Sequence, residues 1–199
     1  MTRKWNAPKL SKNEVIMKVL ILNGNPAGGK GNMDSYIERL MEQIKSAGHE
    51  AQVIVLRNLK IAPCNGCFNC WVKTPGTCSI HDDAGDVSRQ YIAADHVILA
   101  SPLIIGFPSS LLKNTMDRNI PIIHPHLEEV NGEVHHKKRY DRYPVISYLL
   151  EKEACTDDED IAIAMDIFRR QAVNVRASLG FVHFTESPVE EVTHAITVH

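Results

Sequence analysis

Three features are scarce in this chain: net charge, long apolar runs and clusters of catalytic polar residues. Its 22 basic and 24 acidic residues leave a formal net charge of −2, and the basic residues form no stripe, so we expect no nucleic-acid partner. No apolar run is long enough to cross a bilayer. The first sixteen residues lack the apolar core and small-residue cleavage site of a secretory signal. We therefore expect a cytoplasmic protein that does not associate with membranes.

Repeats and low-complexity segments are also missing, and 44% of the 199 residues are hydrophobic, which is typical of one globular domain. We expect an N-terminal arm over residues 1–17, a domain over 18–187 and a C-terminal tail over 188–199. Two segments interrupt the regular pattern of the domain. One is a cysteine-containing loop over residues 58–81. The other is an irregular excursion over 119–143, rich in proline, histidine and charge.

Apolar segments alternate with helical patterns along the domain. Strands are expected over residues 18–23, 51–57, 96–101, 144–150 and 179–184, and the third should end at Pro102. Helices are expected after Asn32 or Ser35, after Asp82 or Asp83, and over residues 109–118 and 161–173. Near-continuously apolar strands separated by helices indicate a parallel sheet covered on both faces. The predicted fold class is α/β, a doubly wound five-stranded parallel sheet with helices on both faces.

A glycine-rich loop follows the first strand and precedes the first helix. Four glycines lie within eight residues between Gly24 and Gly31. Glycine lets the backbone approach an anion closely, and the free N–H groups of a helix start point toward it. The loop lacks a Gly-Lys-Ser/Thr ending and the glycine spacing of dinucleotide-binding proteins. It is therefore either a phosphate-binding loop of another type or an ordinary β–α turn.

The loop after the third strand, over residues 101–110, is unusually apolar. Pro102 and Pro108 stiffen it, and Gly106 would let a flat ligand come close. In parallel sheets, ligands collect beyond the carboxyl ends of the strands, so this loop should converge with the glycine-rich loop. The pair would suit a ligand with an anionic end and a flat heterocycle, such as FMN. The alternative is a buried connection packed under a helix.

These motifs resemble those of a known family. Asn23-Gly-Asn-Pro and Gly31-Asn-Met are similar to the phosphate loop of NAD(P)H-dependent FMN reductases in the flavodoxin-like superfamily. Ser101-Pro-Leu-Ile-Ile-Gly and Leu112-Lys-Asn-Thr-Met-Asp-Arg resemble the second loop and following helix of that family. The resemblance implies strand order 2-1-3-4-5. It also implies FMN contacts from Asn25, Pro26, Gly31, Asn32, Met33, Ser101, Pro102, Leu103, Ile104, Ile105 and Gly106.

The chain departs from the family pattern at several of these positions. Asn25 replaces serine, Ala27 replaces arginine and Met33 replaces threonine, so several phosphate contacts are lost or reassigned. Ile104 stands where the family often has tyrosine, which removes an aromatic neighbour of the flavin. No catalytic side chain is expected, because the flavin itself would carry the hydride chemistry.

Four of the five cysteines lie close together, as Cys64, Cys67, Cys70 and Cys78. A cytoplasmic chain disfavours a disulfide framework. Three cysteines at steps of three with a fourth nearby suit a [4Fe-4S] cluster, and zinc more often uses two separated pairs. The segment is also similar to that of iron–sulfur flavoproteins, a branch of the same superfamily. Thiols with a structural role, or lying near the flavin, are the alternative.

Two classes of function follow. One is an enzyme that takes hydride from NAD(P)H onto FMN and passes electrons to a quinone, a flavin or another small acceptor. The other is a non-enzymatic electron carrier with FMN and a [4Fe-4S] cluster. A third interpretation is a regulatory or scaffold protein that has kept the fold and lost the flavin, as the departures at Ala27, Met33 and Ile104 would allow. We also expect a homodimer, in which the 119–143 excursion or the cysteine loop covers a neighbour's flavin. This expectation rests on the resemblance and on apolar residues taken to be exposed, namely Phe68, Trp71, Ile122, Ile123 and Tyr140.

Overall fold

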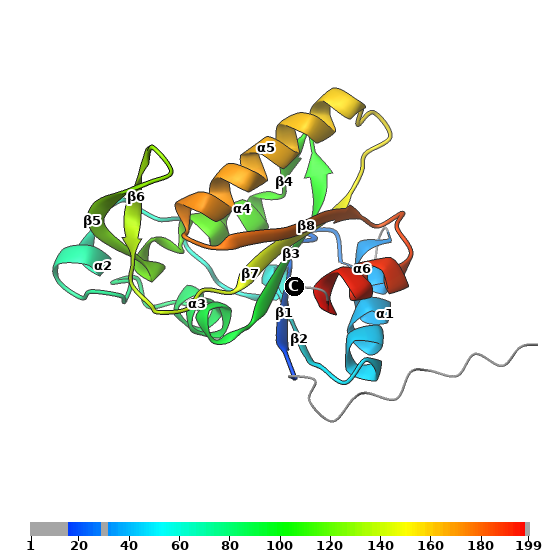
Figure 1. Cartoon of the computed structure of the whole chain (residues 1–199), viewed down its shortest axis with the longest axis horizontal. Coiled ribbons are helices and arrows are strands. Elements are labelled where there is room, and N and C mark those ends of the chain that lie inside the picture. Colours follow the sequence, from blue (N-terminus) through cyan, green and yellow to red (C-terminus); the bar gives the residue numbers. More distant parts are fainter. Residues whose placement is uncertain (1–15, 29–31, 198–199) are drawn as a thin grey trace, which may run out of the picture.

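The fold is a central sheet enclosed by helices, as seen in the computed structural model, which describes residues 16–28 and 32–197. Its five parallel strands are β1 (Lys18–Asn23), β2 (Glu50–Val55), β3 (His96–Ile104), β7 (Val145–Glu151) and β8 (Ser178–Phe184). They lie in the order β2-β1-β3-β7-β8, and each neighbouring pair is parallel. This is the expected 2-1-3-4-5 order, so the predicted flavodoxin-like fold class is confirmed (Figure 1).

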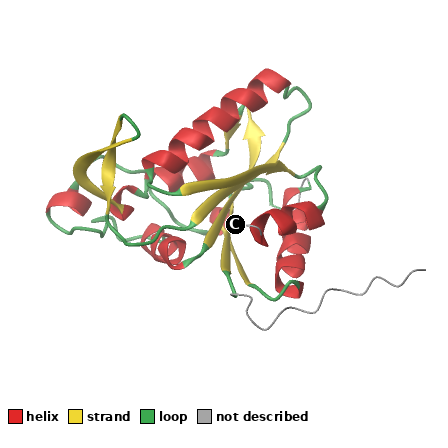
Figure 2. Ribbon diagram, in the orientation of Figure 1, coloured by secondary structure: helices red, strands yellow, loops and turns green. Residues whose placement is uncertain are grey.

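Helices cover both faces of this sheet, as Figure 2 shows. On one face, α1 (Met33–Ser46) packs beside α6 (Val189–Thr197). On the other face lie α3 (Ala84–Ala93), α4 (Ser110–Asp117) and α5 (Asp158–Asn174). Asp157 caps α5, and Asp160 reciprocates in a capping box that satisfies two backbone donors at the helix start.

Alternation along β1 divides the core into two layers. Val19 and Ile21 face the α1 side, whereas Leu20 and Leu22 belong to the layer beneath α3, α4 and α5. Successive side chains of a strand point to opposite faces, so a run of apolar residues buries itself on both sides. This explains why the central strands read as continuous apolar segments in the sequence.

Strand β3 does not end at Pro102, contrary to the sequence expectation. It continues to Ile104 and turns back into a short antiparallel strand, β4 (Phe107–Pro108). A proline removes only its own N–H donor, and Pro102 still lies in register with Glu151 of β7. The residues after Pro102 therefore extend β3 beyond the end of the neighbouring strand β1.

The segment over residues 119–143 is ordered into regular structure, so its description as an irregular excursion was wrong. A 3-10 turn, η2 (Ile120–Ile122), leads into the antiparallel strands β5 (Ile123–Val130) and β6 (Glu133–Lys138). Asn131 and Gly132 join them, both with positive φ angles of 52° and 80°. Asn-Gly is the typical two-residue turn of a β-hairpin. The sequence analysis overlooked this turn because the surrounding segment is rich in proline, histidine and charge.

The C-terminal segment is also part of the fold and not a tail. Helix α6 buries Val192 and Ile196 completely. Just before its start, the carbonyl of Ser187 accepts a hydrogen bond of 2.9 Å from the hydroxyl of Tyr36 on α1. Two short helices complete the described chain, η1 (Leu56–Asn58) and α2 (Asn69–Val72). Most of the predicted N-terminal arm, residues 1–15, lies outside the described residues.

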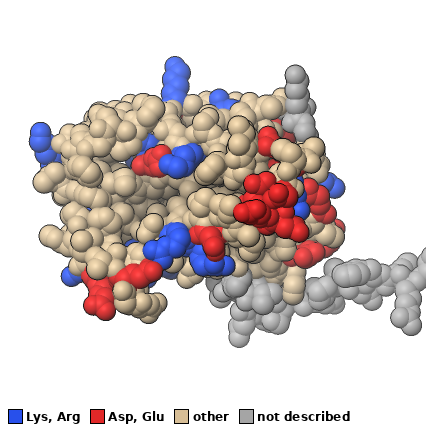
Figure 3. Space-filling model, turned by 90° about the horizontal axis from the view of Figure 1, so that it is seen from above, with Lys and Arg blue, Asp and Glu red and all other residues tan. Residues whose placement is uncertain are grey.

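Charged side chains of both signs lie in separate small groups on the face shown in Figure 3, across a largely uncharged surface. One acidic concentration in the sequence is the first turn of α5, where Asp158, Glu159 and Asp160 complement the positive end of the helix dipole. Among the helices described here, none combines the length and apolar character needed to cross a bilayer.

Candidate functional site

The loops after β1 and β3 are joined directly at the carboxyl edge of the sheet. The Gly24 amide donates to the carbonyl of Ala100 at 2.8 Å, and the Ser109 hydroxyl donates to the carbonyl of Gly24 at 2.5 Å. The Ser109 amide in turn donates to the Ser101 hydroxyl oxygen at 2.8 Å. Ser109 also caps α4, so one residue ties both loops to a helix start. The expected convergence of these two loops is therefore present.

Asp34 organises the first loop. Its carboxylate accepts hydrogen bonds from the side-chain amides of Asn23 at 2.7 Å and Asn25 at 3.2 Å, and it pairs with Arg57 at 2.9 Å. The Asn25 side-chain oxygen accepts from the Ala27 amide, so both ends of this buried side chain are engaged within the loop. The Asn25 side chain therefore helps to shape the loop. Pro26 is exposed beside it.

The N-terminus of α1 retains the donors of an anion site. Asn32 stands at its N-cap position and makes no capping side-chain bond among the described residues. The Asn32 amide instead donates to the Glu151 carboxylate, 2.9 Å away at the end of β7. An acidic group thus already accepts a hydrogen bond from the helix start, in agreement with the positive end of the helix dipole. Met33 begins the helix with its side chain fully buried, and Gly31 lies outside the described residues.

The end of β3 forms an exposed apolar ledge, which we define as Ile104, Ile105 and Phe107. Their side chains are 40%, 84% and 58% exposed, whereas the neighbouring Leu103 is fully buried. Ile104 and Phe107 are directly opposite each other in the β3–β4 pair, so both lie on the same face. A flat ligand could lie on this face, and Phe107 gives it the aromatic neighbour that Ile104 does not provide.

The turn that presents this ledge is strained. Ile105 and Gly106 have φ angles of 52° and 75°, as a two-residue hairpin turn requires. A β-branched residue with positive φ is rare, and such a conformation costs about 1–3 kcal/mol. The Ile105 amide donates to the Glu153 carboxylate at 3.0 Å, which helps to hold the turn.

The four clustered cysteines line one pocket, together with Gly66, Phe68 and Ile120. Cys70 is buried, Cys78 is half-buried, and Cys64 and Cys67 are exposed. Burial raises the pKa of the Cys70 thiol, and the neighbouring Cys78, Cys64 and Cys67 raise it further. The structure therefore brings together the four thiols that the sequence placed in one motif.

The thiols are not arranged around a single ion. Across the described ranges, no group of three or more His, Cys, Asp or Glu residues is placed to hold one metal ion. A cubane cluster binds each thiolate at a different iron, so its ligands surround a larger volume. The backbone amide of Ile80 points at the Cys78 sulfur at 3.5 Å, and the Cys67 sulfur lies 3.5 Å from the Ser79 hydroxyl. Such hydrogen bonds to sulfur are typical of iron–sulfur sites.

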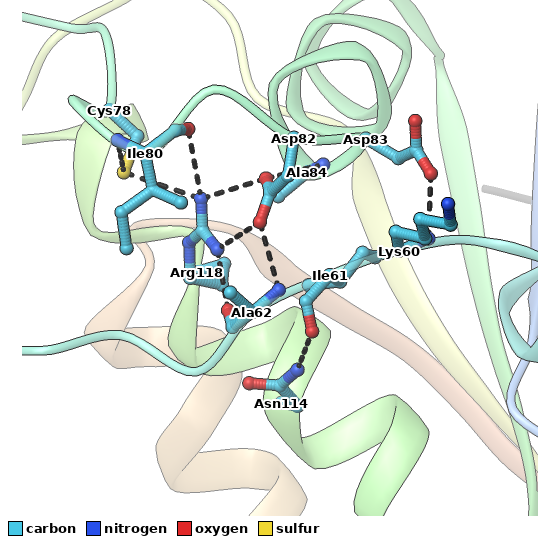
Figure 4. Close-up of polar contacts among 10 residues, drawn as sticks. All are labelled: Lys60, Ile61, Ala62, Cys78, Ile80, Asp82, Asp83, Ala84, Asn114 and Arg118. Carbon is cyan, nitrogen blue, oxygen red and sulfur yellow. Dashed lines mark hydrogen bonds and ion pairs between the residues drawn. The ribbon is translucent and has the colours of Figure 1, made fainter.

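Arg118, at the end of α4, holds the two ends of the cysteine loop together (Figure 4). Its guanidinium forms a two-pronged pair with Asp82 at 2.7 and 3.0 Å and donates to the carbonyl of Ala62 at 2.5 Å. Burial of Asp82 opposes its ionisation, yet hydrogen bonds from Arg118 and from the amides of Ala62 and Ala84 hold its pKa below the ordinary value. The Arg118 side chain is 1% exposed.

The cysteine loop also packs against the hairpin segment. The Trp71 indole donates to the carbonyls of Ile120 and Ile123, both at 3.2 Å, and its ring lies 4.9 Å from that of His136. Ile122 and Ile123 are buried in the core. Of the five residues predicted to form an exposed apolar surface, only Phe68 is largely exposed, at 52%. That part of the expectation was wrong, because the hairpin and the loop cover each other.

Comparison with known proteins identifies the family. The sequence profile of the NADPH-dependent FMN reductase family matches residues 17–137, a range that contains the glycine-rich loop, the ledge and all four clustered cysteines. The chain belongs to this family. Membership makes FMN the cofactor to be tested against the geometry described above.

Curated relatives are iron–sulfur flavoproteins. One from Archaeoglobus fulgidus is 35% identical over 103 residues, which cover 52% of this chain and 49% of that protein. Others, from Methanocaldococcus jannaschii and Methanosarcina thermophila, are 35% identical over 106 residues and 31% identical over 104 residues. These two alignments cover 53% and 52% of this chain, and 53% of each relative. The chain therefore spans about half the length of the curated relatives it matches.

Solved structures share the fold at low sequence identity. The NAD(P)H:quinone oxidoreductase from Methanothermobacter marburgensis is similar with a TM-score of 0.63 and 16% identity, over 92% of this chain and 93% of that one. An FMN-dependent NADH-azoreductase from Bacillus anthracis, in complex with FMN, gives 0.60 and 13%, over 92% and 95%. At this level of identity, the likenesses show that the fold is shared.

One residue of the ledge, Phe107, was missed by the sequence analysis. Phe107 could have been found from strand alternation beyond Pro102, because it lies opposite Ile104 once β3 is extended. Glu151 and Glu153 follow β7, and no local pattern shows that their carboxylates reach the amides of Asn32 and Ile105.

Proposed function

We propose that the protein is an FMN-dependent oxidoreductase that takes electrons from NAD(P)H and passes them to a small acceptor such as a quinone or a flavin. The observation that carries this proposal is the exposed apolar ledge beside an anion-directed helix start, with Ser109 bonding the two loops together. Bound FMN would accept hydride and return electrons, and the protein would supply binding and orientation.

The residues present fit FMN at both ends of the molecule. The start of α1 offers backbone N–H groups without a capping side chain among the described residues, which suits a phosphate. Ile104 and Phe107 offer the flat apolar surface that a flavin ring would cover, and this would remove them from water. The Glu151 carboxylate would have to release the Asn32 amide before a phosphate could use it.

A second candidate is an electron carrier that holds FMN and a [4Fe-4S] cluster. It is favoured by the four thiols lining one pocket and by the iron–sulfur flavoproteins among the relatives. The donor chemistry fits, since each thiol would supply one ligand and the Ile80 amide would hydrogen-bond a ligand sulfur. A cluster there would give electrons a route between the flavin and an external acceptor.

A spectrum and an activity measurement separate these functions. Protein purified without oxygen should show the visible bands of an oxidised flavin, and a cluster would add broad absorption and stoichiometric iron and sulfide. Steady oxidation of NADH or NADPH with a quinone as acceptor supports the enzyme, while a carrier would show almost none. Protein that binds no FMN after incubation with excess cofactor would contradict both.

Replacing Cys67 with serine tests the cluster in the same preparation. Loss of iron with FMN retained would support a cluster ligand, because Cys67 lies in the four-thiol pocket and outside the flavin ledge. Replacing Cys155, an exposed cysteine outside the motif, provides the matched control. Unchanged iron and unchanged turnover in the Cys67 variant would leave the cysteines with a structural role.

A homodimer remains part of the proposal. The exposed ledge and Phe68 provide apolar surface that a second copy could cover, and such surface is unusual on a protein that stays monomeric. Sedimentation of the flavin-loaded protein at micromolar concentration should give twice the chain mass. A flavin-loaded monomer would contradict this.

A further inference from the structure

We propose that Arg118 is a positioning residue of the four-cysteine site: it sets the place of Cys78 and the charge environment of its sulfur. This inference rests on the proposed cluster. Arg118 belongs to α4, outside the cysteine loop, and one guanidinium nitrogen lies 3.4 Å from the Cys78 sulfur. Of the four thiols, only Cys78 has an arginine as a hydrogen-bond partner among the described residues.

The contact is part of a closed, buried junction. Arg118 is 1% exposed and Asp82 is 11% exposed, and their two-pronged pair leaves little rotational freedom for either side chain. The same carboxylate accepts from the Ala62 amide at 2.8 Å, just before the first cysteine. Arg118 also donates to the carbonyl of Ile80 at 3.4 Å, just after the last one. The arginine thus bonds to both ends of the loop that carries the four thiols.

Two neighbouring hydrogen bonds also hold the start of the cysteine loop in place. Asn114, one turn earlier on α4, donates to the carbonyl of Ile61 at 2.8 Å, and the Lys60 amide donates to the Asp83 carboxylate at 2.6 Å. Figure 4 shows these contacts near the Arg118–Asp82 pair. Cys78 is the thiol most distant in sequence from the other three. The contacts that hold the two ends of the cysteine loop together therefore place its sulfur near the other three.

Helix α4 connects this junction to the flavin ledge. Ser109 at its start bonds to Gly24 and Ser101, and Arg118 at its end contacts Cys78. Eight helical residues rise about 12 Å, so one rigid element sets the separation between the two sites. Because the two sets of bonds lie at opposite ends of α4, replacing the Arg118 side chain removes contacts to the thiol pocket and leaves the Ser109 bonds to Gly24 and Ser101 in place.

The hydrogen bond also has an electronic consequence. A donor on a ligand sulfur favours the more negative, reduced form of a cluster, and hydrogen bonds to sulfur are among the factors that set its reduction potential. Removing the Arg118 donor should make the potential of the cluster more negative. Lysine would retain the charge but could not pair with Asp82 through two parallel bonds.

The test compares Arg118→Lys and Arg118→Met with Arg176→Met in the full chain, purified without oxygen. Arg176 is a matched control, because it is also a largely buried arginine, paired with Glu128 at 2.8 Å instead of the cysteine loop. For each protein we would measure iron, sulfide and FMN per chain, the thermal midpoint and the midpoint potential of the cluster.

We expect Arg118→Met to lose most of its iron while keeping FMN. Arg118→Lys should keep more iron than Arg118→Met, with a more negative cluster potential than the unmodified protein. Arg176→Met should keep iron and potential even if its thermal midpoint falls. Normal iron and potential in both Arg118 variants would overturn the proposal, and so would equal iron loss in Arg176→Met.

The outcome is separable from that of the proposed function. Unmodified protein that holds no iron after anaerobic reconstitution would overturn the cluster and this role of Arg118 together. Its FMN content and NAD(P)H oxidation would still decide the reductase function independently.

Discussion

Gly24 lies where the loops after β1 and β3 meet, and there is no room there for a side chain. A Cβ atom built on Gly24 would lie 2.8 Å from the Leu112 Cβ, 3.1 Å from the Ala100 carbonyl oxygen and 3.1 Å from the Ser109 hydroxyl. The Leu112 Cβ moves only with the backbone of α4, so Gly24→Ala must push the helix away from β1. Such overpacking costs about 1–3 kcal/mol.

Part of that cost is offset in the unfolded chain. Alanine has less conformational freedom there than glycine, which favours folding by about 0.4–1 kcal/mol. The net destabilisation should be about 0–2.6 kcal/mol, which corresponds to a fall in the thermal midpoint of up to about 10 °C for a chain of this size. The displaced helix should also lengthen the bond from Ser109 to Gly24 and loosen the flavin site.

Thermal unfolding and FMN content after gel filtration would measure both effects. Gly85→Ala is the matched control, because the only nearby atom is the end of the flexible Arg89 side chain at 3.6 Å and the position is helical. It should raise the thermal midpoint slightly. If Gly24→Ala melted no lower than Gly85→Ala and kept its FMN, the reasoning about this junction would be refuted.

Two further predictions concern the ledge and the pH dependence of stability. Phe107→Ala should weaken FMN binding about 5- to 150-fold, by analogy with the ~1–3 kcal/mol of an aromatic–base stack. Leu127→Ala, at an equally exposed position on the hairpin, should leave FMN binding unchanged. Equal FMN dissociation constants for the two variants would contradict this. Burial raises the pKa of Tyr36 to about 12 from an ordinary value of 10.0. As the pH rises, the Tyr36 hydroxyl therefore loses its proton in the unfolded chain before it does so in the folded protein. The free energy of unfolding should then fall between pH 10 and 12. Tyr36→Phe should reduce that fall, as measured by urea midpoints at pH 9 and 11, and an unchanged pH dependence would show that Tyr36 does not contribute.

Much of the fold could be predicted because its signals are local. Each central strand is a short apolar run, and the helix on each face shows its own periodicity, so their alternation indicated a parallel sheet without any knowledge of contacts. The errors came where local signals compete. Pro102 predicted a strand end, although a proline removes only its own N–H donor and β3 continues to Ile104. The Asn131-Gly132 turn was overlooked because charged residues and histidines surround it.

The sequence predicted that the loops after β1 and β3 converge, but not which of their side chains are exposed. The sequence placed Asn25, Met33 and Leu103 among the contacts, because a motif marks backbone positions and not side-chain directions. In the structure the Asn25 amide bonds within its loop, and Met33 and Leu103 point into the core. The exposed ledge contains Ile104 and Ile105, which the sequence analysis had named among the contacts, and also Phe107, whose position opposite Ile104 depends on the register between two strands.

What the sequence determined by itself was the order of elements, the two loops that follow β1 and β3, and the set of four thiols. These properties follow from spacing along the chain. Only the tertiary structure decided that Glu151 reaches the start of α1, and that Arg118 joins Asp82 and Cys78. Those contacts unite segments that are far apart in sequence. Their geometry depends on how helices and strands pack, which no local pattern encodes.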